Sequence, residues 1–424
     1  MNVGFLGLGK LGLPVALAVE SKGHTVFGHD ISDKVLENIK SKKIDYKEIF
    51  VDKYLPKTKL KVLDIEDLVD SSEIIFIPIQ TPHIEKYEGI TRIPNERADF
   101  DYSYLIDGLK SLSKVVEKKN KEIVVIIIST VLPGTIRREI MPILSAKIKL
   151  CYNPFFIAMG STINDFLQPE FVLFGVDDPY ALKLGKEFYK TITKAPLYDT
   201  TIENAELIKV AYNTLISTKI AFSNTIMELC HKLDNTSIDE VTNALKLANR
   251  RLISTAYMDG GMGDGGGCHP RDNIAMSYLS TKYNISHNWF EHIMMQRESQ
   301  SDWLADIIIQ NSNGKKINIL GKTFKAESNL TLGSPSILLN NILLERGVEV
   351  NIWDPFIDGD FKKFVNLYHW DKEPQLFFIG TKHEEFEDFP FIKGSVVIDP
   401  WRYLSKKEGV KLIKVGDSIF NKNN

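Results

Sequence analysis

Short runs of apolar residues alternate with longer amphipathic stretches through the first part of the chain. In the run from Ile123 to Ile128 every residue is apolar, which is typical of a strand that is covered on both faces. Six such runs predict strands, at Asn2–Leu6, Thr25–His29, Ile74–Pro78, Ile123–Ser129, Lys149–Tyr152 and Phe171–Gly175. The alternation of strands and helices predicts a parallel, doubly wound sheet.

The rest of the chain predicts a helical region followed by a second sheet. The stretch Ile202–Lys232 lacks proline and glycine and predicts one long helix, and helices are also expected at Thr236–Leu247 and His287–Ile309, on either side of the glycine cluster Gly260–Gly267. A second alternation then predicts strands at Lys316–Leu320, Glu349–Trp353, Gln375–Gly380 and Ser395–Asp399, with a helix at Ser336–Arg346. We therefore predict an α/β protein with two Rossmann-like doubly wound domains, residues 1–198 and 311–424, joined by a central helical region, residues 199–310.

Composition narrows the class of protein. The chain has 424 residues, which fits two or three domains, and its 43% hydrophobic and 25% charged residues are ordinary for a soluble protein. A net charge of -3 argues against a nucleic-acid partner. We expect no membrane segment or signal peptide, and a cytoplasmic location. Three scattered cysteines suit a reducing compartment and provide no metal-binding pair, so no metal is expected.

The first chemical motif is Gly7-Leu-Gly9-Lys10-Leu11-Gly12, which follows an apolar strand and opens a helix. Glycines at this spacing allow a tight turn and close approach of the backbone to a pyrophosphate, so we expect the phosphates at Gly9, Lys10 and Leu11. Asp30 ends the next strand, where a carboxylate accepts from both ribose hydroxyls and repels a 2′-phosphate. The motif therefore predicts NAD as the cofactor; the alternative is a glycine-rich turn of another α/β protein.

Polar residues follow two later strands of the same sheet. Thr81-Pro82 and the segment Ser129–Thr135, which includes Thr130, stand at strand ends that face the ligand crevice in doubly wound folds. Further on, Lys209 and Asn213 are one helical turn apart and share a face. A lysine and an amide at one point stabilise a developing oxyanion. Strand-ending turns and a solvated helix face are the alternatives for these residues.

The third motif is Gly263-Asp-Gly265-Gly266-Gly267-Cys268-His-Pro-Arg271-Asp272. The glycines predict a backbone shaped around a ligand, and a helix start next to Cys268 lowers the pKa of a thiol. We therefore expect Cys268 to be a nucleophile, with Asp272 one turn further on. The alternative is a small buried cysteine in a turn.

Taken together, these motifs resemble the UDP-glucose/GDP-mannose dehydrogenase family over nearly the whole chain. The matching segments are the glycine turn, Thr81-Pro82, Ser129–Thr135, Glu206–Asn213 with Thr218-Lys219, Gly265–Asp272, Leu320–Lys325, Ser334–Ser336 and Asp354-Pro355.

This resemblance implies the oxidation of a nucleotide-sugar C6 alcohol, most simply that of a UDP-sugar, to the carboxylate with two NAD. Cys268 then forms the thiohemiacetal and thioester, Lys209 and Asn213 stabilise oxyanions, and Asp272 and Thr130 assist. It implies that the sugar nucleotide is bound by Asn153, Lys209, Asn213, Gly265, Gly266, Lys325 and Ser334. It also implies a homodimer built around the helix Ile202–Lys232.

The sequence departs from the family pattern at four places. Phe155 and Met159 stand where glutamates are expected, and Arg271 replaces a lysine. The arginine expected before Ser334 is absent, because Thr331, Leu332 and Gly333 occupy this stretch. A nucleotide-sugar-binding protein with little turnover therefore stays open as a second hypothesis, since the carboxylate expected at Phe155 is missing.

Overall fold

The computed structural model describes all residues except 47, 83–98, 159, 237, 255–259, 266–272, 274, 275, 278, 279, 327, 360, 423 and 424. The chain divides into two compact units, Met1–Thr218 and Lys219–Asn424, here called the N-terminal and C-terminal units. The division falls inside the long helix α8 (Ile202–Lys232), whose bounds agree with the predicted ones. Both units are α/β, as predicted, while the prediction of a separate central domain at 199–310 stays a prediction.

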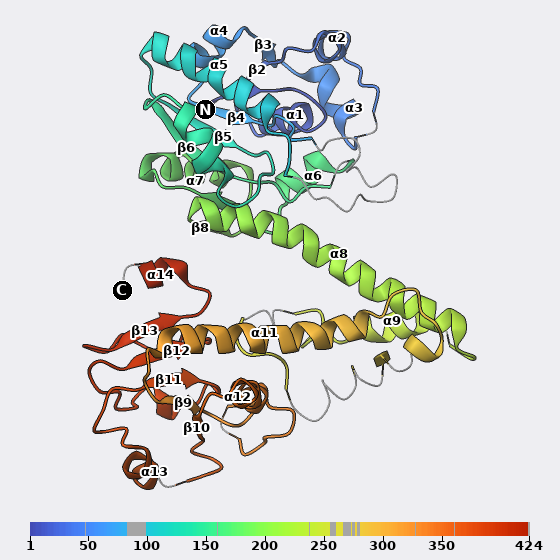
Figure 1. The fold of residues 1–424 in the computed structure, drawn as a ribbon. Coiled ribbons are helices and arrows are strands. Elements are labelled where there is room, and N and C mark those ends of the chain that lie inside the picture. Colours follow the sequence, from blue (N-terminus) through green and yellow to red (C-terminus); the bar gives the residue numbers. More distant parts are fainter. Residues whose placement is uncertain are drawn as a thin grey trace. The chain divides into compact units, whose positions relative to one another are not determined.

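The N-terminal unit is built on one eight-stranded sheet in the order β3-β2-β1-β4-β5-β6-β7-β8 (Figure 1). Its neighbouring strands pair in parallel except β6 and β7. The strands are β1 (Asn2–Leu6), β2 (Thr25–His29), β3 (Lys61–Val62), β4 (Ile74–Ile77), β5 (Ile123–Ile127), β6 (Ile148–Tyr152), β7 (Val172–Gly175) and β8 (Leu197–Thr200). Strands β2 and β3 are added on one side of β1, and β4 and the later strands are added on its other side. The point between β1 and β4 is therefore a topological switch point, where a ligand crevice forms at the carboxyl ends of the strands.

Helices cover both faces of this sheet, which explains its continuous apolar strands. The connecting helices are α1 (Gly12–Ser21), α2 (Asp33–Ser41), α3 (Val51–Tyr54), α4 (Ile65–Ser71), α5 (Ser103–Lys119), α6 (Thr162–Leu167) and α7 (Pro179–Ile192), with short turns at Leu55–Lys57, Ile136–Ile140 and Met141–Ile143. Alternate strand residues divide between two buried clusters: Phe76 packs with α1 and α7, whereas Ile75 and Ile77 pack with α4 and α5.

The C-terminal unit contains a five-stranded parallel sheet in the order β10-β9-β11-β12-β13. Its strands are β9 (Ile317–Leu320), β10 (Val350–Trp353), β11 (Leu376–Ile379), β12 (Val396–Asp399) and β13 (Lys411–Lys414). The helices are α9 (Ile238–Lys246), α11 (Trp289–Ser312), α12 (Pro335–Glu345), α13 (Phe361–Tyr368) and α14 (Ser418–Lys422), with a short turn at Glu384–Phe386. The second half of α11 packs on this sheet together with α12, through Leu304 and Ile308. This order again places a switch point, between β9 and β11, at the carboxyl ends of the strands.

Candidate active site

The turn between β1 and α1 has the geometry that a dinucleotide requires. Gly7 has a φ of 112°, and a Cβ on Gly12 would lie 2.3 Å from the Gly7 carbonyl oxygen. Both positions therefore accept only glycine. A Cβ on Gly9 would meet nothing within 4 Å, and α1 has neither a side-chain cap nor an acidic residue in its first turn. An open backbone beside an uncapped helix N-terminus fits the pyrophosphate of NAD.

Asp30 is held at the end of β2 by the same turn. Its carboxylate accepts from the Leu8 N–H at 2.7 Å and from the Ser32 N–H at 2.8 Å. The side chain is only partly buried, and the adjacent Ile31 is 89% exposed. An oriented carboxylate next to an exposed apolar side chain fits a ribose and its attached base.

Thr81 and Thr130 meet at the ends of β4 and β5, because the Thr81 hydroxyl donates to the Thr130 carbonyl oxygen at 2.8 Å. Ser129 is buried and donates to the Ile77 carbonyl oxygen at 3.3 Å, and it also bonds the Ile79 carbonyl oxygen. The structure thus brings together the two polar segments that the sequence placed at the crevice, and its hydrogen bonds tie one to the other.

The loop after β5 is also fastened to helix α8. The buried carboxylate of Glu206 accepts from the Gly134 N–H at 2.5 Å and from the Ile136 N–H at 2.8 Å. Burial raises the pKa of Glu206, and the two backbone N–H groups oppose that rise. This contact couples the loop that carries Thr130 to the helix that carries Lys209.

Lys209 and Asn213 line one pocket of about 380 Å³ in the N-terminal unit. Lys209 is 8% exposed, its ammonium lies 5.2 Å from the centre of the Phe156 ring, and burial lowers its pKa. The other lining residues are Phe156, Ile157, Ala158, Asp165, Gln168, Pro169, Glu170, Tyr212 and Ile216. A buried ammonium and an exposed amide that line the same pocket suit oxyanion stabilisation, because burial strengthens the interaction of the ammonium with a negative charge.

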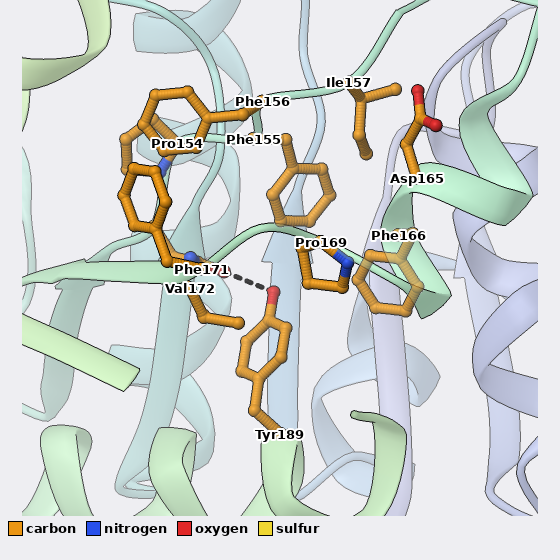
Figure 2. A pocket seen from close by; sticks show the side chains of 11 residues that line it. Pro154, Phe155, Phe156, Ile157, Asp165, Phe166, Pro169, Phe171, Val172 and Tyr189 are labelled. Atoms are coloured by element: carbon orange, nitrogen blue, oxygen red, sulfur yellow. Dashed lines mark hydrogen bonds between the residues drawn. The ribbon is translucent and has the colours of Figure 1, made fainter. Parts of the chain in front are cut away.

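Asn153 and Phe155 line an adjacent small cavity together with several aromatic side chains. Figure 2 shows Phe155 among these rings. Asn153 is buried, donates to the Leu173 carbonyl oxygen at 2.8 Å and accepts from the Tyr189 hydroxyl. Phe155 packs against Phe166 with ring centres 5.5 Å apart. The residue that replaces the expected glutamate therefore extends an apolar cluster, and the amide predicted to bind substrate is engaged by protein groups.

Two pocket residues were not predicted from the sequence. The Tyr212 hydroxyl donates to the Glu170 carboxylate at 3.4 Å, and both residues line the pocket that Lys209 and Asn213 also line. The pKa of Tyr212 is raised, mainly by burial and to a smaller extent by the negative charge of Glu170. The sequence could have indicated Tyr212, because it stands between Lys209 and Asn213 on the same helix. Glu170 belongs to no recognisable pattern.

In the C-terminal unit, the described part of the predicted substrate site surrounds Gly265. A Cβ on Gly265 would lie 2.6 Å from the Cβ of Phe324 and 3.1 Å from the Gly333 carbonyl oxygen. Lys325 follows at an exposed position. Ser334 is buried and caps α12, accepting from the N–H groups of Ser336 and Ile337. Gly266, Cys268, Arg271 and Asp272 lie outside the described residues, so their predicted roles stay predictions.

The turn after β9 repeats the turn after β1. Gly321 has a φ of 103°, and the Lys322 N–H donates to the Asp354 carboxylate at 2.7 Å, as the Leu8 N–H does to Asp30. Asp354, however, is fully buried and also bonds His383 Nε2 at 3.1 Å. Burial opposes ionisation of Asp354, but the bonds from His383 and the backbone outweigh it and hold the pKa of Asp354 below its usual value. This second carboxylate is therefore structural.

Among the described cysteines, Cys151 is buried, which raises the pKa of its thiol, and Cys230 is half-buried. A thiol with a raised pKa is a poor nucleophile at neutral pH. In the part of the chain that the structure describes, no helix is long and apolar enough to cross a membrane.

A doubly wound sheet with a glycine turn, an acidic residue at the end of β2 and polar strand ends at the switch point defines an NAD-binding enzyme of the dehydrogenase class. Family comparison agrees, because residues 1–193 match the UDP-glucose/GDP-mannose dehydrogenase family NAD binding domain, residues 203–297 its central domain and residues 318–406 its UDP binding domain. The chain belongs to the UDP-glucose/GDP-mannose dehydrogenase family, and NAD is its cofactor.

Individual relatives resemble the chain over almost its full length. UDP-glucose 6-dehydrogenase of Rickettsia conorii is 28% identical over 449 residues, covering 99% of this chain and 100% of that protein. GDP-mannose 6-dehydrogenase of Pseudomonas aeruginosa is 25% identical over 367 residues, covering 84% and 81%. A crystal structure of a ternary complex of GDP-mannose dehydrogenase from Pseudomonas aeruginosa shares the fold, with a TM-score of 0.85, 23% identity and coverage of 97% and 99%. The chain is thus an NAD-dependent nucleotide-sugar dehydrogenase by class.

Proposed function

We propose that this protein oxidises the C6 alcohol of a nucleotide sugar, a UDP-sugar, to the carboxylate, with Cys268 as the covalent nucleophile. The observation that carries the proposal is the pairing of Lys209 and Asn213 on one pocket, on a helix that Glu206 joins to the loop after β5. A buried cation and an amide donor suit the oxyanion that forms at each stage of such an oxidation.

The overall reaction balances as one alcohol, one water and two NAD⁺ giving one carboxylate, two NADH and protons. NAD supplies a hydride acceptor when it is bound at the glycine turn and Asp30. Loss of one hydride to the bound acceptor and of one proton converts the alcohol to an aldehyde. The Cys268 thiolate then adds to the aldehyde carbon and forms a C–S bond, and Lys209 stabilises the resulting oxyanion. Loss of hydride gives a thioester, and attack by water breaks the C–S bond and releases the carboxylate and the thiol.

Hydrolysis of the thioester proceeds without a carboxylate at Phe155, whose ring packs against Phe166. A thioester is a good acyl donor, so water positioned by Thr130 and Lys209 requires only modest activation. General-base assistance is typically worth about 10²–10⁴-fold in rate. We therefore expect slow hydrolysis and accumulation of an acyl adduct on Cys268.

The test is mass spectrometry of enzyme quenched during turnover, together with NADH absorbance, over a panel of UDP- and GDP-sugars. The proposal expects NADH formation and a sugar adduct on Cys268 that is absent in Cys268→Ser. Full activity of Cys268→Ser would refute covalent catalysis.

A protein that binds nucleotide sugars with little turnover is the second candidate. The apolar packing of Phe155 favours it, since this replaces the carboxylate expected there. Binding of a UDP-sugar with neither NADH nor an adduct, across the whole panel, would establish it instead.

A further inference from the structure

Arg297 on α11 joins two segments of the C-terminal unit. Its Nε donates to the Asp264 carbonyl oxygen at 3.1 Å and lies 3.0 Å from the Asp264 carboxylate. Its Nη2 donates to the Gly333 carbonyl oxygen at 2.9 Å. The side chain is only 16% exposed, so the charge is largely removed from water and is neutralised by Asp264.

The first of these segments leads to the proposed nucleophile. Gly260–Gly265 ends three residues before Cys268 and is held from several sides. The Gln300 amide donates to the Gly261 carbonyl oxygen at 2.9 Å, and a Cβ on Gly261 would lie 2.4 Å from the Trp401 ring. The backbone therefore has a defined path up to Gly265, and Arg297 holds the last carbonyl group before it.

The second segment is the loop in which the sequence lacks an expected arginine. Leu332 stands in this loop and is 71% exposed. The carbonyl oxygen of the next residue, Gly333, accepts a hydrogen bond from the guanidinium of Arg297 on α11. Gly333 also touches the first segment, since a Cβ on Gly265 would meet its carbonyl oxygen. The loop then runs directly into Ser334 and the start of α12.

We infer that Arg297 is a positioning residue for the proposed reaction, supplying from α11 the guanidinium that is absent before Ser334. It fixes Asp264, and with it Gly265, against the loop expected to hold the nucleotide, and Gly265 stands three positions before Cys268 in the sequence. The inference rests on the proposed function for its catalytic consequence, but the anchoring itself does not depend on turnover. A planar guanidinium with several fixed donors suits this task, whereas a lysine offers one point charge.

The kinetic test compares Arg297→Gln and Arg297→Lys with wild type, using UDP-glucose and GDP-mannose as probes. Because Arg297 contacts both the segment that precedes Cys268 and the loop that precedes Ser334, kcat should fall by a larger factor than KM rises. Loss of hydrogen bonds to a charged group predicts a decrease of about 10-fold or more for Arg297→Gln. Arg297→Lys should recover part of it.

The matched control is Arg346→Gln, which also removes a guanidinium that contacts α11, through Asp302 and Asp306 at the surface. Wild-type kcat in this variant, with reduced kcat in Arg297→Gln, supports the inference. Unchanged kcat in Arg297→Gln overturns it, and so does a rise in KM alone, which would assign Arg297 to ground-state binding.

A second measurement separates this inference from the proposed function. Amide hydrogen exchange of a peptide that covers Gly260–Gly265 should be faster in Arg297→Gln than in wild type and Arg346→Gln, with or without UDP-glucose. Equal exchange in all three proteins overturns the anchoring even if the enzyme is active. If exchange is faster in Arg297→Gln and the wild-type protein forms no NADH, the anchoring is supported and the proposed reaction is rejected.

Discussion

Replacement of Glu206 by glutamine should weaken the N-terminal unit at the point where α8 meets the β5 loop. The Glu206 carboxylate is buried and accepts from the backbone N–H groups of Gly134 and Ile136. A glutamine of the same shape presents one oxygen to one of these donors. Its amide nitrogen then faces the other, so one N–H is left buried without an acceptor.

The expected loss follows from the value of hydrogen bonds to charged groups, about 1.5–3 kcal/mol each. Glu206→Gln removes one such bond and weakens the other, but the neutral amide avoids the cost of burying a charge, so we expect a net loss of about 1–2 kcal/mol. Glu206→Ala removes both and should cost about 3–5 kcal/mol. Because the loop carries Thr130, NAD binding should weaken as well.

The assay is guanidinium unfolding of the full chain, following the transition of the N-terminal unit, with NAD titration by fluorescence. Glu203→Gln is the control, since Glu203 lies on the same helix and pairs with Arg137 at the surface, where it is 41% exposed. Exposed pairs contribute about 0–1 kcal/mol. A loss in Glu206→Gln within about 0.5 kcal/mol of that in Glu203→Gln would refute the reasoning.

The same variant gives a pH signature. Burial raises the pKa of Glu206, so the folded state holds this proton more tightly than the unfolded chain does. Its contribution to stability therefore decreases as pH rises from the ordinary glutamate pKa through the raised value. Glu206→Gln should lack this dependence.

Three further predictions concern the cofactor, the lysine and the oligomer. Asp30→Ala should weaken NAD by about 1.5–3 kcal/mol, measured as Kd by fluorescence titration, and should reduce the preference over NADP; equal Kd values in variant and wild type would contradict the assignment. Burial lowers the pKa of Lys209, so kcat should fall at alkaline pH as the ammonium deprotonates, and a pH profile with no alkaline limb would count against its role as a cation. The exposed Leu207, Leu215 and Ile216 on α8 fit a covered face in a homodimer, and light scattering of wild type and Leu215→Arg should give dimer and monomer; a monomeric wild type at micromolar concentration would reject this.

Regular elements were predictable from the sequence where the hydrophobic pattern was strong. The six N-terminal strands and helix Ile202–Lys232 were found with nearly the observed bounds. The missed strands are β3, which has two exposed residues, and β8, whose sequence Leu-Tyr-Asp-Thr is mostly polar; β13 is likewise flanked by lysines. Edge strands of this kind bury little, so no apolar run marks them.

The candidate site was predictable only where chemistry is encoded locally. Lys209 and Asn213 share a helix face and line one pocket, as their spacing required. Arg297, in contrast, contacts residues 33 and 36 positions away through carbonyl groups, which leave no trace in residue identity. Glu206 likewise binds backbone N–H groups 70 and 72 positions away. Such contacts between a side chain and a distant backbone group arise from the tertiary fold, so they cannot be predicted from the sequence pattern alone.

The same turn, a glycine with positive φ followed by an N–H that donates to a carboxylate, occurs in both units, and burial of the carboxylate differs between them. Asp30 and Asp354 both end a second strand and both accept the N–H that follows a left-handed glycine. Asp30 keeps partial access to solvent beside the exposed Ile31, whereas Asp354 is sealed under His383 and the stacked Phe356 ring. A carboxylate that is already fully hydrogen-bonded inside the protein gains nothing from a ribose. We therefore expect the repeated turn to serve cofactor recognition in the first unit and rigidity in the second. We also expect the C-terminal unit to bind a nucleotide elsewhere, along the Gly265, Gly333 and Ser334 segments next to Arg297.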